Sequence, residues 1–418
     1  MSARVTSKRL VIVGASLAGL RAAEGARASG FTGEIVLIGA EEHLPYDRPP
    51  LSKQYLGDAE IPYLRDPDSY VHELNVRAVL GNPVTALRPA EKAVVVNGES
   101  ISYDSLVIAT GAAPRELPGY SDIPGVVTLR NLEDTHSLRR ALDATHNITI
   151  VGAGIIGAEI ATAARKRGCE VTVIEATNYP LERAVGREMG LVLSQMHPRN
   201  GTDLRCGVTL AELRTEGEGG KVSSVVLSDG SEIKTDLLLV SIGVVPTTSW
   251  LKDSGIELHP DGSIACDEYL KTSLDDVYAA GDAISWPNAH TGRTGRLETW
   301  TSANEQGAIA GRNAAGVEDP LAYSTVPYFW SDWYGNRIQF AGTAHDAEPE
   351  VVIGGYEEEK FVVLYRSGDH VVGALAVNEP AKIMKDRRRI QQRSTWAEAV
   401  EHYKELGRKL ALIQQETV

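Results

Sequence analysis

Cysteine is scarce in this chain of 418 residues. Only Cys169, Cys206 and Cys266 are present, and no two of them form a C-x-x-C pair. Three cysteines cannot build a disulfide scaffold or supply the ligands of an iron–sulfur cluster. Isolated cysteines are most often inert, buried thiols. We therefore expect a protein of a reducing compartment.

Long apolar runs and an excess of positive charge are also missing. The longest apolar runs, such as Leu237–Val240 and Val371–Val377, are far too short to span a bilayer. The first residues lead into a strand-like run without the pattern of a secretory signal peptide. With 42 Lys+Arg against 56 Asp+Glu, the net charge of −14 repels nucleic-acid phosphates and anionic lipids. We expect a cytoplasmic protein that binds neither nucleic acid nor a membrane.

The histidines offer no metal site. None of the 10 histidines belongs to a cluster with metal-ligand spacing, so no metal is expected. A G-x-S-x-G nucleophile elbow is absent as well. Hydrophobic residues make up 43% and charged residues 23%, which is typical of a globular protein. The length predicts about three domains.

A repeated strand–turn–helix–strand pattern organises the chain. The glycine-containing turns are Gly14–Gly19 and Gly152–Gly157, which start 138 residues apart. Each turn follows a short apolar run and precedes an alanine-rich helical stretch and a second apolar run. The flanking runs are 10–13 and 34–38 in the first copy, and 148–151 and 171–174 in the second. Each copy predicts a parallel sheet with a right-handed crossover.

The second copy lies inside what resembles an interrupted first domain. Strand-like runs ending in glycine occur on both sides of it, at 105–111 and 236–243. We predict an α/β fold with two Rossmann-like dinucleotide-binding domains and a C-terminal α+β domain. The predicted boundaries are 1–115 with 245–322 for FAD, 116–244 for NAD, and 323–418 for the C-terminal domain.

The C-terminal segment has a different sequence pattern. Three β-rich runs are predicted at 351–356, 361–366 and 371–378, with a turn at 367–370 between the last two. A segment with helical period follows, and Ser394 is its predicted N-cap.

The second glycine turn carries every part of a dinucleotide-binding fingerprint. Gly152 permits the turn, Gly154 lets the backbone approach a pyrophosphate, and Gly157 lets the helix lie close to the strand. Glu175 ends the next strand, where a carboxylate accepts ribose hydroxyls. A carboxylate there would repel a 2′-phosphate, so Glu175 favours NADH over NADPH. Nearby basic residues weaken this preference unless they are solvated charges; they are Arg165, Lys166, Arg167 and Arg183.

The first glycine turn departs from the fingerprint. Ser16 replaces the middle glycine, although a serine hydroxyl can also bond phosphate. Its partner acid is ambiguous, because Glu41 and Glu42 are both available. Two complete units predict two dinucleotides. A flavin and a nicotinamide are the expected pair, because hydride passes from one ring to the other.

Further segments carry a resemblance that covers nearly the whole chain. The chain resembles the two-dinucleotide flavoprotein reductases of the glutathione reductase structural superfamily. Within it, the chain is similar to bacterial NADH-dependent ferredoxin reductases of the putidaredoxin reductase type, which serve oxygenases. The segments that carry the resemblance are YDRPPLSK at 46–53, ATG at 109–111, VYAAGD at 277–282, RLETW at 296–300 and PYFWSD at 327–332.

The resemblance implies FAD and NADH as cofactors, and it implies their binding residues. In the family, Asp282 would hold the ribityl chain; the plainer alternative is an N-cap. A helix opening at Asn304–Gly307 would face the flavin with its N-terminus. The complete set of cofactor-binding residues is Gly14, Ser16, Ala18, Gly19, Glu41, Arg48, Lys53, Val84, Ala109, Thr110, Gly111, Arg130, Gly152, Gly154, Ile155, Ile156, Glu159, Glu175, Arg183, Ile242, Gly243, Asp282, Glu298, Thr299, Trp300 and Trp330.

Lys53, Glu159 and Trp330 are the catalytic residues that the resemblance implies. The family places the glutamate beside the lysine, near the nicotinamide and flavin rings. The alternative reading of Glu159 is a first-turn acid that complements the helix dipole, and that of Lys53 is a solvated lysine. Trp330 belongs to an aromatic cluster with Tyr328, Phe329, Trp333 and Tyr334, and such a cluster is more often core than cofactor site.

The resemblance implies an NADH-dependent reductase that passes single electrons to a [2Fe-2S] ferredoxin, which feeds a cytochrome P-450 or a Rieske-type oxygenase. The segment 47–55, where disulfide reductases of this superfamily carry an active cysteine, has none. The alternatives are an NADH oxidase or peroxidase, and a redox interaction protein resembling apoptosis-inducing factor. Either a monomer or a homodimer is compatible with the sequence.

An acidic ferredoxin would need a local basic surface on this acidic chain. The predicted docking surface is either a basic stretch or the rim around Trp330. The basic stretch comprises Lys382, Lys385, Arg387, Arg388, Arg389 and Arg393. A solvated charged loop is the alternative for this stretch.

Overall fold

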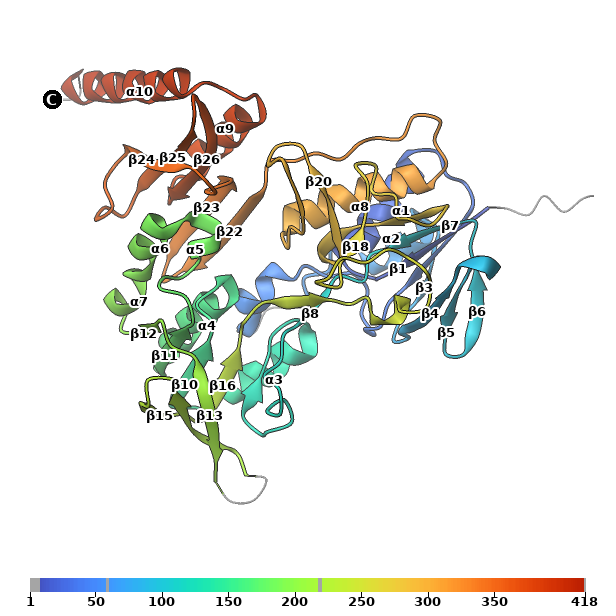
Figure 1. The fold of residues 1–418 in the computed structure, drawn as a ribbon, viewed down its shortest axis with the longest axis horizontal. Helices are drawn as coiled ribbons and strands as arrows, with labels where there is room; N and C mark the ends of the chain where they lie inside the picture. Colours follow the sequence, from blue (N-terminus) through green and yellow to red (C-terminus); the bar gives the residue numbers. More distant parts are fainter. Residues whose placement is uncertain (1–7, 58–59, 217–219, 417–418) are drawn as a thin grey trace, which may run out of the picture. The chain divides into compact units, whose positions relative to one another are not determined.

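The fold is described from a computed structural model, which describes residues 8–57, 60–216 and 220–416. The chain divides into two compact units. Among the described residues, the first unit comprises 8–50, 60–113 and 244–325, and the second comprises 51–57, 114–216, 220–243 and 326–416. Figure 1 shows both units and labels many of their elements.

A five-stranded parallel sheet forms the centre of the first unit. Its order is β19-β7-β1-β2-β3, and each neighbouring pair is parallel. The apolar run Leu10–Val13 is buried throughout, as expected for a strand covered on both faces. The strands are β1 (Arg9–Val13), β2 (Glu34–Ile38), β3 (Val76–Val79), β7 (Ser105–Ile108) and β19 (Val277–Ala279).

Two helices of the first unit lie side by side, α1 (Leu17–Ala28) and α8 (Trp300–Ala314) (Figure 1). Glycines make this close approach possible. A Cβ on Gly307 would lie 2.3 Å from the Ala18 carbonyl oxygen, and one on Gly311 would lie 1.9 Å from that of Ala22. A helix–helix contact of this kind admits no side chain at those positions.

Smaller elements complete the first unit. They are α2 (Pro67–His72), the antiparallel sheet of β4 (Val84–Arg88), β5 (Ala93–Val96) and β6 (Glu99–Ser102), the pair β8 (Ala112–Pro114) and β17 (Val244–Pro246), the sheet of β18 (Ile264–Ala265), β20 (Ile284–Asn288) and β21 (Arg293–Gly295), and 3₁₀ turns at Pro89–Glu91, Ser249–Leu251 and Gly281–Ala283.

The second unit contains another five-stranded parallel sheet, in the order β12-β11-β10-β16-β9. Its strands are β9 (Val126–Val127), β10 (Asn147–Val151), β11 (Glu170–Glu175), β12 (Asp203–Cys206) and β16 (Leu237–Val240). Its helices are α3 (Leu132–Asp143), α4 (Ile155–Lys166), α5 (Glu182–Val185), α6 (Arg187–Ser194) and α7 (Met196–Arg199). The strands β13 (Leu210–Thr215), β14 (Val222–Leu227) and β15 (Glu232–Lys234) form a separate sheet, and Gln54–Leu56 is a 3₁₀ turn.

A five-stranded antiparallel sheet forms the C-terminal part of the same unit. Its order is β22-β23-β26-β25-β24. One apolar cluster joins this sheet to α4, α5 and α6 through residues such as Ala158, Val185 and Trp333. A second cluster joins it to the C-terminal helices. The elements are β22 (Tyr328–Trp333), β23 (Asn336–Gly342), β24 (Glu348–Ile353), β25 (Phe361–Ser367), β26 (His370–Val377), α9 (Pro380–Gln391) and α10 (Trp396–Glu416).

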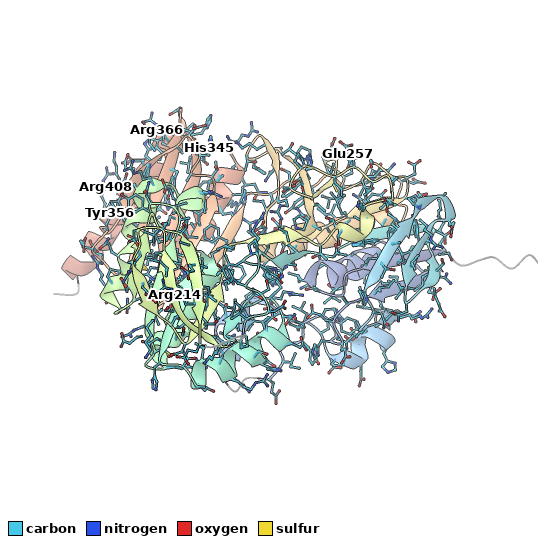
Figure 2. All side chains as sticks on the ribbon, turned by 60° about the horizontal axis from the view of Figure 1, so that its bottom comes forward. Arg214, Glu257, His345, Tyr356, Arg366 and Arg408 are labelled. Atoms are coloured by element: carbon cyan, nitrogen blue, oxygen red, sulfur yellow. The ribbon has the colours of Figure 1, made fainter. Side chains whose placement is uncertain are left out.

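Polar side chains cover the outside of the second unit. Arg214 lies on β13, and Arg366 on β25 places its guanidinium 5.7 Å from the ring centroid of Trp396 (Figure 2). Tyr356, also labelled in Figure 2, donates a 2.6 Å hydrogen bond to Glu188 of α6. This bond links the loop between β24 and β25 to α6 at the surface.

The structure corrects three local predictions. Helix α8 begins at Trp300 with Thr299 as its N-cap, so Asn304–Gly307 lies inside the helix rather than at its start. Helix α10 is capped by Thr395, not Ser394: Thr395 Oγ1 accepts from the backbone N–H of Glu398, and the Glu398 carboxylate accepts from that of Thr395. Glu159 lies past the first turn of α4, which has no acidic residue. The dipole reading of Glu159 is therefore wrong.

The predicted fold class is confirmed: two parallel-sheet units of Rossmann type occur together with a C-terminal α+β part. The predicted strand at 34–38 matches β2 at both ends, and β7 lies within the predicted strand-and-turn run 105–111. None of the helices in the described residues is both long enough and apolar enough to cross a membrane.

Candidate active site and cofactor sites

The first glycine turn joins β1 to α1 and packs tightly against the sheet. Gly14 has a φ of +121°, and a Cβ there would lie 2.0 Å from the Ala109 carbonyl oxygen. The Ala109 N–H in turn donates to the Val13 carbonyl at 2.7 Å. The predicted residues 14–19 and 109–111 therefore meet at the carboxyl ends of β1 and β7, where ligands bind in open parallel sheets.

Glu41 rather than Glu42 is tied into this end of the sheet. Arg48 Nη2 lies 2.6 Å from Glu41 Oε1, and the Tyr46 hydroxyl donates to Glu41 Oε2. Arg48 Nε also donates to Ser16 Oγ at 3.2 Å, which places the serine of the first turn beside the same arginine. Glu42 is exposed. Of the two acids, Glu41 is the one that the structure holds beside the glycine turn.

Buried polar atoms without partners lie in the predicted flavin region. Among the described residues, neither Thr110 Oγ1 nor Gln306 Nε2 has a hydrogen-bond partner, although both atoms are buried. Gln306 Oε1 accepts from the backbone N–H of Gly281, next to the predicted Asp282. Buried polar atoms are normally satisfied, so a polar ligand at this site would satisfy them. These residues fit a dinucleotide such as FAD.

The start of α8 brings three more predicted residues to the first unit's site. Thr299 caps the helix, with its hydroxyl accepting from the Ser302 N–H at 3.2 Å. Trp300 Nε1 donates to Asp47 Oδ1 at 2.7 Å. Glu298 forms an ion pair with Arg296 at 2.8 Å. Val84 starts β4 and packs against the core of this unit.

The second glycine turn joins β10 to α4, and its three glycines serve different purposes. A Cβ on Gly152 would lie 2.3 Å from the Ser241 carbonyl oxygen, and one on Gly157 would lie 2.1 Å from that of Gly152. A Cβ on Gly154 would meet no protein atom within 4 Å. The first two glycines are therefore required by packing, whereas Gly154 leaves open space at the N-terminus of α4, which suits a phosphate.

Glu175 faces this turn from the end of β11. Its Oε2 accepts from the backbone N–H of Ala153 at 2.9 Å, and its Oε1 accepts from the N–H and the hydroxyl of Thr177 at 2.9 and 2.8 Å. The carboxylate is thus held at the position that the fingerprint predicts for a ribose-binding acid. Ile156 and Ile242 are among the exposed large hydrophobic residues, with 38% and 37% exposure. Arg183 on α5 is exposed, and Arg130 follows β9.

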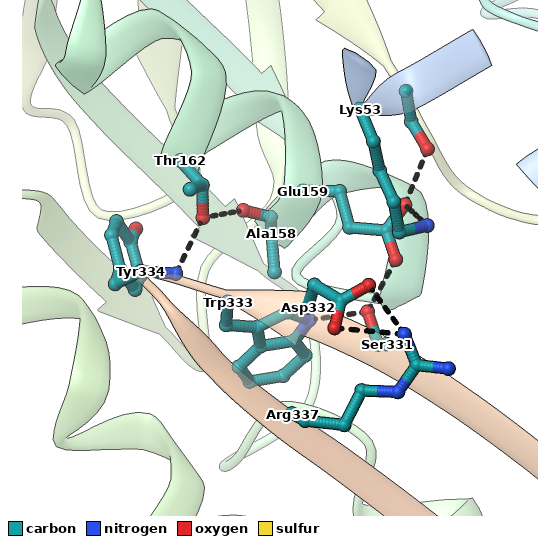
Figure 3. A network of polar contacts seen from close by, with 10 residues as sticks. Lys53, Ala158, Glu159, Thr162, Ser331, Asp332, Trp333, Tyr334 and Arg337 are labelled. Atoms are coloured by element: carbon teal, nitrogen blue, oxygen red, sulfur yellow. Dashed lines mark hydrogen bonds and ion pairs between the residues drawn. The ribbon is translucent and has the colours of Figure 1, made fainter. Parts of the chain in front are cut away.

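Lys53 and Glu159 form a buried ion pair in the second unit. Lys53 Nζ lies 2.8 Å from Glu159 Oε2, and the glutamate side chain is only 1% exposed (Figure 3). Two hydroxyls also donate to this carboxylate: Ser52 Oγ to Oε2, and Ser331 Oγ to Oε1 at 2.6 Å. A buried carboxylate needs such donors to offset its loss of hydration. The structure therefore brings together two of the three predicted catalytic residues.

Ser52 and Ser331 are functional candidates that the sequence reasoning did not single out. Both lie inside the quoted segments YDRPPLSK and PYFWSD. Their positions next to Lys53 and Trp330 could have marked them as candidates. The contact between Ser331 and Glu159 cannot be predicted from the sequence pattern, because the two residues are 172 positions apart.

Trp330 lies next to Ser331 on β22. The Arg337 guanidinium lies 5.5 Å from the Trp330 ring centroid, and it is held by Asp332 at 3.0 Å. Tyr328 lies 6.0 Å from Trp330, ring to ring, and Arg387 of α9 lies 5.5 Å from the Tyr328 ring. Arg387 of the predicted basic stretch is therefore linked to Trp330 through Tyr328.

None of the three cysteines is poised for thiolate chemistry. Burial raises the pKa of the Cys206 thiol to about 11, and it also raises the pKa of Cys169 and of Cys266. The thiolate is the reactive form. These residues are therefore thiols at neutral pH. In the described part of the chain, no group of three or more His, Cys, Asp or Glu side chains is arranged to hold a metal ion.

Comparisons with known proteins agree with this geometry. The profile of the family described as "pyridine nucleotide-disulphide oxidoreductase" matches residues 8–307, and the profile "reductase C-terminal" matches residues 328–402. Rhodocoxin reductase of Rhodococcus erythropolis is 34% identical over 384 residues, which cover 91% of this chain and 88% of that protein.

Two further similarities point the same way. The ferredoxin–NAD(+) reductase component of the p-cumate 2,3-dioxygenase system of Pseudomonas putida is 35% identical over 393 residues, covering 93% of this chain and 94% of that protein. The crystal structure of the covalent putidaredoxin reductase–putidaredoxin complex matches with a TM-score of 0.87 and 32% identity, covering 92% of this chain and 93% of that chain.

Proposed function

Because the chain belongs to the pyridine nucleotide-disulphide oxidoreductase family, we propose that it is an FAD-dependent reductase that takes electrons from NADH and passes them to a [2Fe-2S] ferredoxin. That ferredoxin would feed a cytochrome P-450 or a Rieske-type oxygenase. The observation that carries the proposal is the 35% identity, over 93% of the chain, to the ferredoxin–NAD(+) reductase component of a dioxygenase system. The chain acts in the cytoplasm, as a monomer or a homodimer.

The two dinucleotides are assigned to different parts of the chain. FAD is assigned to the domain 1–115 with 245–322, where Thr110 and Gln306 carry unpartnered buried atoms. NADH is assigned to the domain 116–244, on Gly154 and Glu175. Residues 323–418 form the third domain. FAD, when bound, accepts an electron pair from NADH and can release electrons singly.

The residues of the chain bind, orient and hold charge. Glu175 accepts the ribose hydroxyls of NADH, and its negative charge disfavours a 2′-phosphate. Lys53 and Glu159 form a buried ion pair whose charges nearly cancel, close to the flavin and nicotinamide rings. Trp330 lies on β22, the strand that also carries Ser331. No cysteine enters the electron path, since all three thiols are kept protonated by burial.

The proposal is tested by following the visible spectrum of the purified protein. We expect flavin absorption that bleaches when NADH is added without oxygen, and that returns when an oxidised [2Fe-2S] ferredoxin is mixed in a stopped-flow instrument. NADPH should bleach it much more weakly. NADH consumption with no electron transfer to any ferredoxin, and with matching oxygen uptake, would instead identify an NADH oxidase.

A docking surface for the ferredoxin is assigned to α9 and the side chains beside Trp330. On α9, Lys385 and Arg388 are exposed, as is Arg393 just beyond it. Arg387 and Tyr328 connect this helix to Trp330 through a cation–π contact and a tilted pair of aromatic rings. Ferredoxins are usually acidic, so exposed cations next to an aromatic side chain supply both attraction and an apolar contact.

A further inference from the structure

The hydroxyl of Ser331 stands in the middle of a one-way chain of hydrogen bonds that ends on Glu159 (Figure 3). Trp333 Nε1 donates to Ser331 Oγ at 2.8 Å, and Ser331 Oγ donates to Glu159 Oε1 at 2.6 Å. An indole N–H can only donate, and an ionised carboxylate can only accept. The single proton of the serine hydroxyl must therefore point at Glu159.

These hydrogen bonds are buried, so the loss of one of them affects the Glu159 carboxylate strongly. Trp333 and Ser331 are 0% exposed, Ser52 and Glu159 are 2% exposed, and no bulk water replaces a donor that is removed. Ser52 and Lys53 both contact Oε2, so Ser331 is the hydroxyl that orients Oε1. Losing one donor to a buried charged group costs more than losing a neutral hydrogen bond.

The hairpin that carries Ser331 holds α4 at a second point. The backbone N–H of Tyr334 donates to Thr162 Oγ1 at 3.1 Å, one turn along α4 from Glu159 (Figure 3). Ser331 and Trp330 are neighbours on β22, and neighbouring side chains of a strand point to opposite faces. A single strand therefore carries both the tie to Glu159 and Trp330.

We propose that Ser331 is a positioning residue for the reaction, fixing the carboxylate of Glu159 toward Lys53 from the C-terminal sheet. The proposal rests on the proposed function. Its physical basis is the fixed donor direction: because Trp333 occupies the acceptor side of the hydroxyl, Ser331 has no alternative orientation that leaves both partners satisfied. The proposed holders of the adenosine half of NADH are Glu175 and the Gly152–Gly157 turn, which Ser331 does not contact, so we expect the effect mainly on the limiting rate of flavin reduction and little on NADH affinity.

The first test compares Ser331→Ala, Ser331→Cys and Ser331→Thr in the FAD-loaded protein, with Ser194→Ala as the matched control. Ser194 is also a buried serine of the second unit, but its hydroxyl donates to Leu191 of its own helix. In anaerobic stopped-flow mixing with NADH, we expect Ser331→Ala to lower the limiting rate constant of flavin bleaching about 10-fold, with the NADH Kd within about twofold. Ser331→Thr restores the rate to within about threefold, and Ser331→Cys, a weak donor, lies between.

The second test uses unfolding instead of turnover. Ser331→Ala and Glu159→Gln are combined in a double-mutant cycle, and the urea midpoint of the holoenzyme is followed by far-UV circular dichroism. We expect the double variant to lose clearly less than the sum of the single losses, because Ser331→Ala removes the donor of this hydrogen bond and Glu159→Gln removes the charge of its acceptor.

The two experiments distinguish a failure of the Ser331 role from a failure of the proposed function. A normal bleaching rate in Ser331→Ala overturns the positioning role, as does an equal loss in Ser331→Thr together with additive urea midpoints. If Ser331→Ala does not fold, the Cys and Thr variants carry the test. Failure of NADH to bleach the unsubstituted protein contradicts the proposed function itself, whereas the urea cycle still reports on the contact.

Discussion

At the scale of single residues, the three glycines of the second turn differ in what a side chain would meet. Gly152 and Gly157 abut carbonyl oxygens, but Gly154 faces open space. A glycine that packing does not require is explained by a ligand that approaches the backbone closely. The functional and structural glycines of one motif can therefore be separated by experiment.

We predict that Gly154→Ala leaves the fold intact and weakens NADH binding about 10-fold, because the added methyl group occupies the space of the pyrophosphate. Gly157→Ala serves as the matched control and should destabilise the protein instead, since its Cβ would lie 2.1 Å from the Gly152 carbonyl oxygen. Thermal melting and an NADH titration measure the two effects. Equal NADH affinity in Gly154→Ala and the unsubstituted protein would contradict the pyrophosphate assignment.

Residue identities in the site were predictable where a motif fixes their spacing. The pairing of Lys53 with Glu159 follows from the family resemblance, and the structure places the two atoms 2.8 Å apart. The choice between Glu41 and Glu42 could not be made from the sequence, because it depends on Arg48 and Tyr46 folding back onto one of them. Ser331 was missed for the same reason, since its partner lies on another element.

At the scale of elements, α1 and α8 illustrate why helix ends are harder to predict than helix contacts. The sequence suggests a helix start at 304, whereas Thr299 caps α8 five residues earlier. A threonine before a tryptophan is a weak start signal compared with the glycine and alanine pattern inside the helix. That inner pattern instead reports the contact with α1.

We predict that Gly311→Ala strongly destabilises the first unit, because its Cβ would lie 1.9 Å from the Ala22 carbonyl oxygen and would force α1 and α8 apart. The expected loss is about 2 kcal/mol or more of unfolding free energy. The same substitution at Gly407 of α10, where a Cβ meets nothing within 4 Å, should stabilise its helix slightly. Urea unfolding of the two variants should therefore shift in opposite directions.

A buried histidine of α7 is linked to the turn after β22 and to the residue before β12. His197 of α7 is 0% exposed, and its Nδ1 lies 2.9 Å from the hydroxyl of Tyr334, which donates to Thr202 at 2.9 Å. Among the described residues, His197 Nε2 is buried and has no hydrogen-bond partner. Burial lowers the pKa of His197 to about 4.

This lowered pKa predicts a stability loss in mild acid. The unfolded chain binds a proton on His197 below a pKa of about 6.5 and the folded chain does not, so stability is full above that pH and falls as the pH drops toward 4. Between pH 7 and pH 5 the expected loss from this group is about 2 kcal/mol. His197→Gln removes this part of the pH dependence. Urea unfolding of both proteins at the two pH values measures it; parallel losses would contradict the assignment.

At the scale of the whole molecule, the family name and the chemistry of this chain differ. The family is described by disulphide oxidoreduction, yet the three cysteines are dispersed and their thiols are protonated at neutral pH. The sequence predicted this correctly, because an absent residue needs no fold to be recognised. We therefore expect the same scaffold to serve a reaction in which no cysteine takes part.

We therefore predict that replacing Cys169, Cys206 and Cys266 together by alanine leaves kcat for ferredoxin reduction within about twofold, because none of them carries electrons. Some stability is lost, mainly from Cys169, which is 2% exposed in the core. Steady-state rates with ferredoxin measure the effect at a temperature below the melting point of the variant. A loss of activity beyond the loss of folded protein would show that a thiol takes part.

On a chain with a net charge of −14, attraction between a basic docking surface and an acidic partner should weaken as salt is added. Arg388 and Arg389 are neighbours in the predicted basic stretch, but the structure gives them different surroundings. Arg389 forms an ion pair with Asp386, which is 0% exposed, so its reversal would damage the packing of α9. Arg388 is exposed, and its reversal tests docking without that cost to the fold.

We predict that Arg388→Glu raises the KM for ferredoxin about 5-fold or more at low ionic strength, and that the difference shrinks as salt screens the surface. Lys234→Glu, on the exposed β15, makes the same change of net charge on another sheet and should leave the KM within about twofold. Both variants make the chain more acidic by the same amount. A raised KM in both would therefore reflect the overall negative charge, whereas a raised KM in Arg388→Glu alone would reflect a docking surface on α9. Reduction of ferricyanide, which needs no protein partner, should be equal in both variants.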